Sequence, residues 1–367
     1  MRRSGAHRPR PLYPPGAGGG EEPGGSLAPA GEQAVKVEAE VLGGYPRSER
    51  VRKTLRRLEE KGEAGFMDAV RAVWEDTLLL IGVQLGAGLD AAVDPVLEWH
   101  DPLRPFAEAW RNVAVDGLLR WFDNNFFYRI PVFVDEPDPK RYVLAPRVRQ
   151  LRASTPSWAR LKVVLPGPVT FARLSKNNTG KSLEELAADI AAILAREARM
   201  AAEAGASVVQ LDEPWLADVD ATPDDAVLAA ELASKILGEA KAAGASTRLA
   251  IEYNVPEPGV YEKLGSLKNV DYLVIDVADA PEKALKLLEA KAAPTSGLGL
   301  GVVQARNIYP EHYGAVKPLI ERAVKAVKPE ALLLTTSAWL DLIPLSYAVE
   351  KTNILGHIAA HARKDFS

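Results

Sequence analysis

Two adjacent carboxylates follow a short apolar run, and they are the residues in this chain best placed to do chemistry. The run Val208-Val-Gln-Leu211 leads directly into Asp212, Glu213, Pro214 and Trp215. An apolar run of this length is typical of a buried parallel strand. Carboxylates at the carboxyl end of a strand are where an α/β barrel holds its catalytic groups. The alternative is that Asp212 and Glu213 cap the segment that follows.

Polar residues follow several other apolar runs in the same way. They are Gly43 and Gly44, Asp94, Thr170, Glu252 and Asn254, Asp276, and Arg306 with Asn307. A closed barrel gathers the carboxyl ends of its strands at one face, so these groups are expected to meet there. Acidic side chains dominate the set, which favours an amino group or a divalent metal with oxygen ligands. No glycine-rich phosphate loop followed by lysine is present, so a nucleotide phosphate site is not indicated.

The elements that must position these residues alternate regularly along the chain. Strands are predicted at 35–42, 86–93, 160–165, 207–212, 247–253, 271–276, 297–303 and 331–335. Helices are predicted at 50–61, 66–83, 183–204, 226–243, 256–267, 281–292, 315–327 and 345–360. Eight alternating units predict a (β/α)₈ TIM barrel, because closure leaves no strand edge unpaired. A doubly wound open sheet is the alternative.

Two stretches depart from this alternation. Residues 102–160 follow the second strand and are rich in aromatic residues, which predicts an inserted helix and hairpin that could form a lid over the barrel mouth. Residues 1–34 hold arginines, glycines and prolines without periodicity, which is typical of a disordered tail. A start codon placed too early would also explain this tail. We therefore predict a single barrel domain spanning 35–367.

Composition excludes several classes of protein. The 367 residues include no cysteine, so disulfides, a cysteine nucleophile and thiolate metal ligands are excluded. The net charge is −4 and the two signs are interleaved, so no nucleic-acid surface is expected. No apolar run approaches the roughly 20 residues of a membrane span. We expect a cytoplasmic protein, and the Ala, Leu, Glu, Lys and Arg of its helices fit a thermophile.

Four segments resemble the cobalamin-independent methionine synthase family, in its single-barrel archaeal form. Leu42-Gly-Gly-Tyr-Pro-Arg47 is similar to the family's opening segment, and Leu165-Pro-Gly-Pro-Val-Thr170 to its Gly-Pro-Val-Thr segment. Gln210-Leu-Asp-Glu-Pro214 resembles its Asp-Glu-Pro strand end. Residues 299–307 resemble its Gly-Val-Val to Arg-Asn segment, in the form of the N-terminal barrel. The resemblance covers the chain from about residue 37 to its end.

The resemblance implies a (β/α)₈ barrel that transfers a methyl group to the thiol of homocysteine. In that family a zinc ion binds the sulfur and stabilises the thiolate, which attacks a methyl donor. The resemblance gives Gly43 and Gly44 the substrate carboxylate and Asp212 its amine, with Glu213 supporting Asp212. The donor, methyl-folate or a corrinoid protein, is not specified by the sequence.

Further contacts with the substrate are expected from residues at the other strand ends. Trp215 could stack on a flat donor, and Arg306 could hold a carboxylate through its planar fork. The remaining candidates in this group are Asp94, Thr170 and Asn307.

The sequence departs from the family at the zinc site. Zinc-binding members use a His-x-Cys pair, a glutamate and a late cysteine, whereas this chain has Glu252-Tyr-Asn254, Asp276 and Thr335-Thr-Ser-Ala338. Glu252, Asn254 and Asp276 could gather magnesium or calcium, but zinc activating a thiol prefers nitrogen and sulfur ligands.

Three hypotheses follow from these departures. The chain is a methyltransferase with altered metal use, or a non-catalytic barrel partnering a separate zinc-bearing barrel. The third alternative is a protein that binds a small amino acid or a pterin without chemistry.

Overall fold

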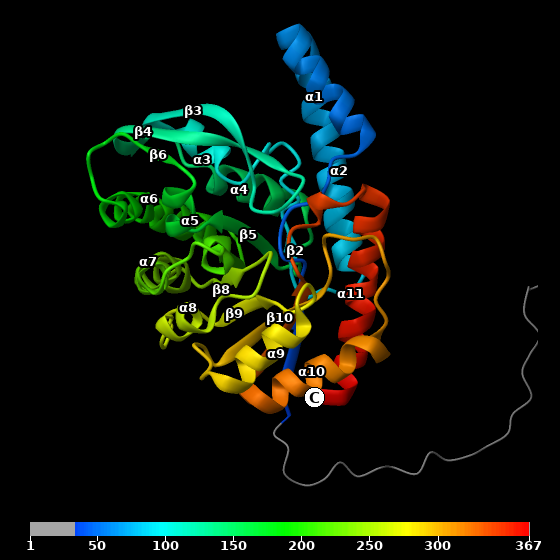
Figure 1. Cartoon of the computed structure of the whole chain (residues 1–367). Coiled ribbons are helices and arrows are strands. Elements are labelled where there is room, and N and C mark those ends of the chain that lie inside the picture. The colour runs from blue at the N-terminus through cyan, green and yellow to red at the C-terminus, as the bar shows by residue number, and fades with distance from the viewer. Residues whose placement is uncertain (1–33, 367) are drawn as a thin grey trace, which may run out of the picture. The chain divides into compact units, whose positions relative to one another are not determined.

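The barrel is built from eight parallel strands. The computed structural model describes residues 34–366, so the predicted tail lies outside the described residues except for Ala34. In chain order the strands are β1 (Lys36–Ala39), β2 (Ala92–Val93), β5 (Leu161–Pro166), β7 (Val208–Asp212), β8 (Ser246–Ile251), β9 (Tyr272–Asp276), β10 (Gly297–Val303) and β11 (Ala331–Thr336). Their order in the sheet is β1-β11-β10-β9-β8-β7-β5-β2. A parallel bridge between Glu40 and Ala91 brings the two end strands together, and the predicted barrel is confirmed (Figure 1).

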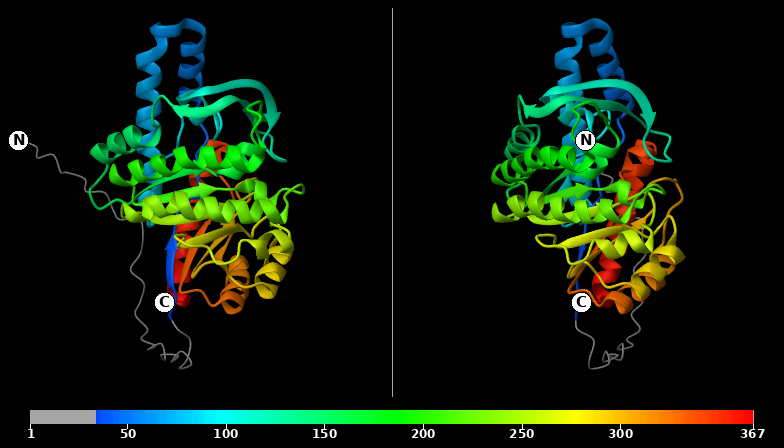
Figure 2. Two further views of the ribbon diagram at one scale, coloured as in Figure 1. Left: turned by 90° about the vertical axis from the view of Figure 1, so that its left-hand side faces the viewer. Right: turned by 60° about the vertical axis from the view of Figure 1, so that its left-hand side comes forward.

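Helices cover the outside of the sheet. They are α1 (Glu49–Lys61), α2 (Phe66–Gly86), α3 (Arg104–Ala109), α4 (Leu144–Ser154), α5 (Pro168–Arg173), α6 (Leu183–Glu203), α7 (Pro223–Ala242), α8 (Pro258–Lys263), α9 (Pro281–Ala290), α10 (Tyr313–Val327) and α11 (Leu345–Phe366). Ser182 and Thr222 begin α6 and α7 with reciprocal capping boxes, which explains why these two helices start where they do. The pair α1 and α2 extends beyond the barrel (Figure 2). No helix between residues 34 and 366 is long and apolar enough to cross a membrane.

The prediction for the second strand was wrong in its length. A strand was expected at 86–93, but α2 continues to Gly86 and β2 holds only Ala92 and Val93. The side chain of Gln84 explains the difference. Its amide donates to the carbonyl of Val93 at 3.0 Å and accepts from the amide of Val93 at 2.8 Å. A side chain of the preceding helix therefore makes the hydrogen bonds that a neighbouring strand would otherwise make.

The segment after β2 forms a small second sheet beside the barrel. Strands β3 (Trp110–Arg120) and β4 (Phe127–Pro139) make an antiparallel hairpin, as the aromatic insertion predicts, and α3 and α4 flank it. A third strand, β6 (Lys176–Asn177), pairs with β4 from outside the insertion and was not predicted. The turn of the hairpin is closed by the amide of Trp121, which donates to the carbonyl of Phe126 at 2.8 Å. This turn places aromatic side chains where the barrel strands end.

A buried ionic cluster fills the barrel on the amino side of the strands. The carboxylate of Glu40 accepts from Lys162 Nζ at 2.9 Å and from Arg248 Nε at 3.2 Å. Glu38 accepts from the hydroxyl of Tyr272 at 3.0 Å. The two cations hold the pKa of Glu40 at about 2, against the burial that opposes its charge. The lower barrel is thus filled by charges that are paired with one another.

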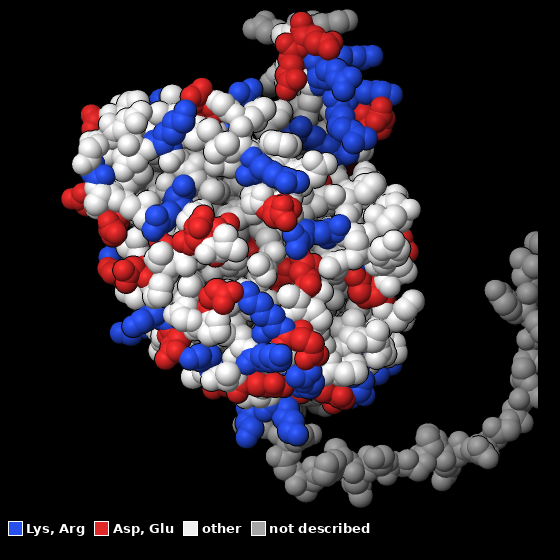
Figure 3. All heavy atoms as spheres, viewed as in Figure 1, with Lys and Arg blue, Asp and Glu red and all other residues white. Residues whose placement is uncertain are grey.

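The surface carries both signs of charge across one face of the molecule (Figure 3). Basic side chains gather most densely on α1, whose sequence is Glu49-Arg-Val-Arg-Lys-Thr-Leu-Arg-Arg-Leu-Glu-Glu-Lys61. Several of these are paired with acidic neighbours, and Arg50 bridges to Glu75 and Asp76 of α2. The visible surface therefore lacks a long unbroken basic stripe.

Candidate functional site

Asp212, the last residue of β7, lies at the centre of the barrel mouth. One carboxylate oxygen accepts a hydrogen bond from Gln210 Nε2 at 2.6 Å, and the other accepts from the indole Nε1 of Trp339 at 2.9 Å. Only 6% of the residue is exposed. Burial raises the pKa of Asp212 to about 6, although both donors and the charge of Lys162 favour the ionised form. The carboxylate is available as an acceptor for a cationic donor near neutral pH.

The indole of Trp339 lies against the backbone of Gly43 and Gly44. A Cβ on Gly43 would lie 2.1 Å from the indole nitrogen, and one on Gly44 would lie 2.7 Å from the six-membered ring. The amide of Leu340 donates to the carbonyl of Gly44 at 2.9 Å, which joins the two loops. The paired glycines therefore allow an aromatic ring to approach, at the backbone where the resemblance implies that a substrate carboxylate binds.

Three tryptophans close the space above Asp212. We name this space the carboxylate chamber; Trp99, Trp121 and Trp339 line it together with Asp212 and Glu252. Its volume is about 10 Å³, which is close to the minimum for one water molecule. The aromatic insertion supplies Trp121, so the hairpin turn does lie over the mouth. As it stands, the chamber is too small for an amino acid.

Several buried polar atoms around the mouth have no hydrogen-bond partner. Among the described residues they include Gln210 Oε1, Glu252 Oε2, Asp276 Oδ2, Thr335 Oγ1 and Trp121 Nε1. Unpaired buried polar atoms are rare in folded proteins, because each loses its hydrogen bonds to water. Four of the five are hydroxyl or carbonyl-type oxygens that can accept, which favours a ligand rich in N–H donors.

The residues predicted as a weak metal site do not form one. Burial, and then the charges of Asp212 and other carboxylates including Asp276, hold the pKa of Glu252 well above its usual range. Burial and the charge of Asp279 do the same for Asp276. The amide oxygen of Asn254 accepts from the next residue's amide at 2.8 Å. Between residues 34 and 366, no group of three or more His, Asp or Glu side chains could hold a metal ion.

The family's zinc ion does not fit these residues. The donors at the corresponding positions are oxygen atoms only, and the raised pKa values favour neutral carboxyl groups. Zinc that activates a thiol requires charged or basic ligands, with nitrogen and sulfur preferred.

Glu213 faces a helix rather than the chamber. Its carboxylate accepts from the amides of Val169 at 3.0 Å and Thr170 at 2.8 Å, and from the Thr170 hydroxyl at 2.6 Å. These are donors at the amino end of α5, where a carboxylate is favoured. Burial nevertheless raises the pKa of Glu213 to about 7. The predicted catalytic Glu213 and the predicted substrate-binding Thr170 therefore bond each other, although Thr170 also lines the chamber.

Asp94 and Trp215 are engaged elsewhere. Asp94 forms a two-bond ion pair with Arg147, at 2.9 Å and 3.0 Å. The indole of Trp215 donates to Asp225 at 3.2 Å, and the guanidinium of Arg173 lies 5.6 Å from the centre of its ring. Both predicted substrate residues contact other elements of the protein and are not among the residues that line the chamber.

Arg306 and Asn307 also lie outside the chamber. Arg306 forms an ion pair with Asp279 and approaches Asn124 Oδ1 at 3.4 Å. It lines a separate surface pocket of about 490 Å³ together with Asn254. Asn307 uses its side-chain oxygen to accept from the amide of Tyr309 at 2.9 Å.

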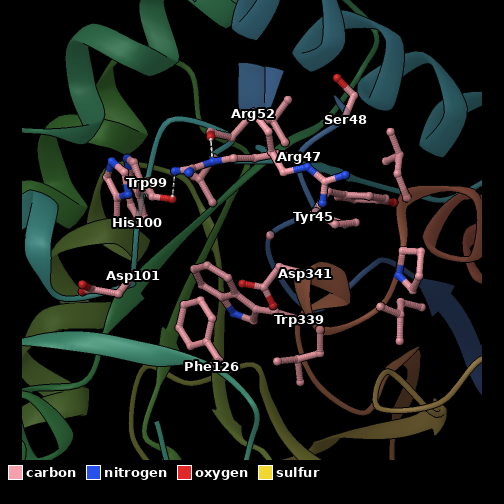
Figure 4. Close-up of a pocket in the computed structure, with 18 of the residues that line it drawn as sticks. Tyr45, Arg47, Ser48, Arg52, Trp99, His100, Asp101, Phe126, Trp339 and Asp341 are labelled. Atoms are coloured by element: carbon pink, nitrogen blue, oxygen red, sulfur yellow. Dashed lines mark hydrogen bonds between the residues drawn. The ribbon is translucent and has the colours of Figure 1, made fainter. Parts of the chain in front are cut away.

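A larger pocket opens to solvent on the other side of Trp339. We name it the outer pocket; it has a volume of about 650 Å³ and is lined by Arg47, Trp99, Phe126, Trp339 and Asp341 among others (Figure 4). Arg47 donates to the carbonyls of Leu97 and Trp99, both at 2.6 Å, and this fixes one wall. Burial raises the pKa of Asp341 to about 7.

Sequence reasoning missed Trp339 and Asp341 as site residues. Trp339 and Asp341 follow the last strand, as the other candidates follow theirs, so the same strand-end argument could have found them.

The chain is similar to several known proteins. The model of a family described as "Cobalamin-independent synthase, N-terminal domain" matches residues 107–328. A protein of Sulfurisphaera tokodaii named "Methionine synthase" is 25% identical over 85% of this chain and 88% of its own length. A Bifidobacterium animalis subsp. lactis protein named "5-methyltetrahydropteroyltriglutamate--homocysteine methyltransferase" is 29% identical over 69% of this chain and 33% of its own length.

Solved structures share the fold. A B12-independent methionine synthase from Shewanella sp. W3-18-1, in complex with selenomethionine, has a TM-score of 0.70 at 20% identity, covering 89% of this chain and 98% of its own. A putative vitamin-B12-independent methionine synthase from Listeria monocytogenes has a TM-score of 0.71 at 17% identity, covering 90% and 99%.

Proposed function

Because the chain belongs to the cobalamin-independent methionine synthase family, we propose that it serves methyl transfer to the homocysteine thiol as a metal-free barrel. In this proposal a second, zinc-bearing barrel protein carries out the thiol chemistry. The present chain binds the amino-acid substrate or product at its mouth and supports that partner. The match to the family's N-terminal domain agrees with such a role.

The observation that carries the proposal is the set of donors at the mouth. Zinc, when bound, lowers the pKa of a thiol and so supplies the nucleophile. This chain has no cysteine, and Glu252 and Asp276 are buried carboxyl groups whose pKa values lie well above the usual range. Their donor atoms are oxygens, whereas zinc that activates a thiol prefers nitrogen and sulfur ligands. The mouth is therefore suited to hydrogen bonding and poorly suited to activating sulfur.

Asp212 is the residue we expect to bind the ligand amine. A protonated amine beside its carboxylate would favour the ionised form and strengthen the hydrogen bond between them. Gln210 holds one carboxylate oxygen at 2.6 Å and thereby fixes the orientation of the side chain. The chain's contribution in this scheme is binding and orientation of the amino acid.

The test compares methionine formation by the purified chain, by a zinc-bearing family barrel from the same organism, and by a mixture of the two. Homocysteine and a methyl-labelled folate or corrinoid donor are supplied with added zinc. We expect no product from this chain alone and a higher rate from the mixture than from the zinc-bearing barrel. When this chain carries Asp212→Ala, the mixture should form methionine no faster than the zinc-bearing barrel alone. A mixture no faster than the zinc-bearing barrel would contradict the proposal.

A second candidate is that this chain is itself the methyltransferase. The Sulfurisphaera tokodaii relative supports it, because a protein matched over 88% of its length carries the name "Methionine synthase". The same assay separates the two functions. Methionine formed by this chain alone, and lost in Asp212→Ala, would favour the second candidate over the first.

A further inference from the structure

Trp339 separates two spaces of very different size. On one side lies the carboxylate chamber, of about 10 Å³, and on the other lies the outer pocket, of about 650 Å³. The residue lines both spaces, and only 5% of it is exposed (Figure 4). Trp339 therefore forms, with Trp99, the wall between the outer pocket and Asp212, and of these two side chains only Trp339 donates a hydrogen bond to Asp212.

The contacts of Trp339 are those expected of a bound ligand. Its N–H donates to Asp212 at 2.9 Å, and its ring covers the backbone of Gly43 and Gly44. These are the positions at which the family resemblance implies that the amine and the carboxylate of an amino acid bind. No other tryptophan among the described residues donates to Asp212.

We propose that Trp339 is an internal occupant of the ligand site and determines its specificity. Asp212 becomes available only to a primary ammonium compound that displaces the indole toward the outer pocket. This inference rests on the proposed role of Asp212 in binding an amine. It adds that the site is closed until such a ligand arrives, and that compounds without an amine are excluded.

The count of hydrogen-bond donors explains why an ammonium group can replace the indole. An indole has one N–H, whereas a primary ammonium has three and carries a charge. Gln210 Oε1 and Glu252 Oε2 are buried acceptors without partners. Gln210 lies two residues before Asp212 on β7, and Glu252 follows the neighbouring strand β8, two residues after the register partner of Asp212. An ammonium group could satisfy acceptors that Trp339 leaves unpaired. A ligand with a single neutral donor gains nothing over the indole.

Displacement requires the side chain to rotate, because the backbone on both sides is held. The amide of Leu340 donates to Gly44 at 2.9 Å, and the amide of Ser337 donates to Val303 at 2.8 Å. The hydroxyl of Ser337 also accepts from the amide of Ala305 at 3.0 Å. The outer pocket offers space for the ring.

The chamber walls indicate the rest of the ligand. Trp99 and Trp121 remain when Trp339 leaves, and aromatic rings favour contact with a thioether or methylene chain. The ligand class that fits is an α-amino acid with an apolar or sulfur-containing side chain.

The first experiment measures ligand binding by calorimetry for three proteins: the unaltered chain, Trp339→Ala and the control Trp158→Ala. Trp158 is 71% exposed and lines none of the pockets described, so its loss tests for a general effect of removing a tryptophan. The probes are methionine and 4-(methylthio)butanoic acid, which is methionine without its amine. We expect Trp339→Ala to bind methionine at least tenfold more tightly than the unaltered chain, with no gain for the deaminated compound or in the control.

A second measurement covers the case in which Trp339→Ala does not fold. Trp339→Phe keeps a ring but lacks the N–H, and should bind methionine more tightly by about threefold. Saturating methionine should change the tryptophan fluorescence of the unaltered chain, and this change should be smaller in Trp339→Phe, where only Trp99 and Trp121 report on the chamber. Unchanged affinity in both Trp339 variants, or an equal gain for the deaminated compound, would overturn the inference. The mixing experiment with the zinc-bearing barrel would still decide the proposed function, because it measures the rate of methionine formation and not the access of a ligand to Asp212.

Discussion

Replacing Gly167 by alanine should test whether Glu213 is a structural residue. Gly167 has φ −69° and ψ 143°, a conformation open to any residue, so backbone strain does not explain the glycine. A Cβ there would lie 2.0 Å from the carboxyl carbon of Glu213 and 2.4 Å from its Cγ. The three atoms nearest to this Cβ all belong to Glu213, so the substitution must move that side chain.

The expected cost follows from what Glu213 would lose. Crowding a packed interior costs about 1–3 kcal/mol. Moving the carboxylate also leaves the amides of Val169 and Thr170 without their acceptor, and each buried unpaired donor costs about 1–3 kcal/mol. Because partial relaxation offsets part of this, we expect Gly167→Ala to lower the free energy of unfolding by about 3 kcal/mol.

Urea unfolding of four proteins measures the effect: the unaltered chain, Gly167→Ala, Glu213→Ala and the double variant. In the double variant the added methyl group meets no carboxylate. The loss of unfolding free energy in the double variant should therefore be smaller than the sum of the losses in the two single variants by at least ~1 kcal/mol. Gly82→Ala in α2 is the matched control, since its Cβ would meet nothing within 4 Å and helical alanine is favoured over glycine. If the losses of unfolding free energy in the two single variants add up to the loss in the double variant, the contact between the Gly167 position and Glu213 is refuted.

Three further predictions concern buried ionisable groups and the removal of metal ions. The free energy of unfolding should fall between about pH 5 and pH 8, because burial raises the folded-state pKa of Glu197, Glu213 and Asp341 to about 7, so the unfolded state ionises first as the pH rises. Glu197→Gln should remove the share of this fall that Glu197 contributes and make the profile measured by urea unfolding less steep. Lys162→Met should lower the free energy of unfolding by about 3 kcal/mol, since Glu40 would keep Arg248 as its remaining close cation, and a loss under ~1 kcal/mol would contradict that network. Dialysis against EDTA should leave the melting temperature unchanged, and a clear drop would reveal a bound metal.

Much of the fold could be predicted because its signals are local. Apolar runs such as 208–211 and 272–275 identify strands, and eight alternations with helices identify the barrel. The length of strand β2 was not predicted, because α2 extends to Gly86 and the side chain of Gln84 replaces part of the pairing that usually defines a strand. Strand β6 is only two residues long and depends on a neighbour from the insertion.

The site was harder to predict than the fold because its contacts join distant parts of the chain. Asp212 and Trp339 are 127 positions apart, and Glu213 bonds residues 43 and 44 positions earlier. The sequence places Asp212 and Glu213 side by side, but consecutive side chains of an extended segment point in opposite directions. One therefore faces the chamber and the other faces α5.

The hydrogen-bond pairing of polar groups inside the barrel differs between the two ends of the strands, and this difference indicates where a ligand binds. Arg248 within β8 is buried and bonded to the buried Glu40, which follows β1, whereas Glu252, four residues beyond Arg248, retains a buried oxygen without a partner. A fold that needed charge only for stability would pair the upper layer as it pairs the lower one, because each unpaired buried group is costly. The unpaired acceptors lie at the carboxyl end of the strands, which is where this fold places its ligands. The pairing therefore separates a lower layer that stabilises the barrel from an upper layer that we expect a ligand to complete.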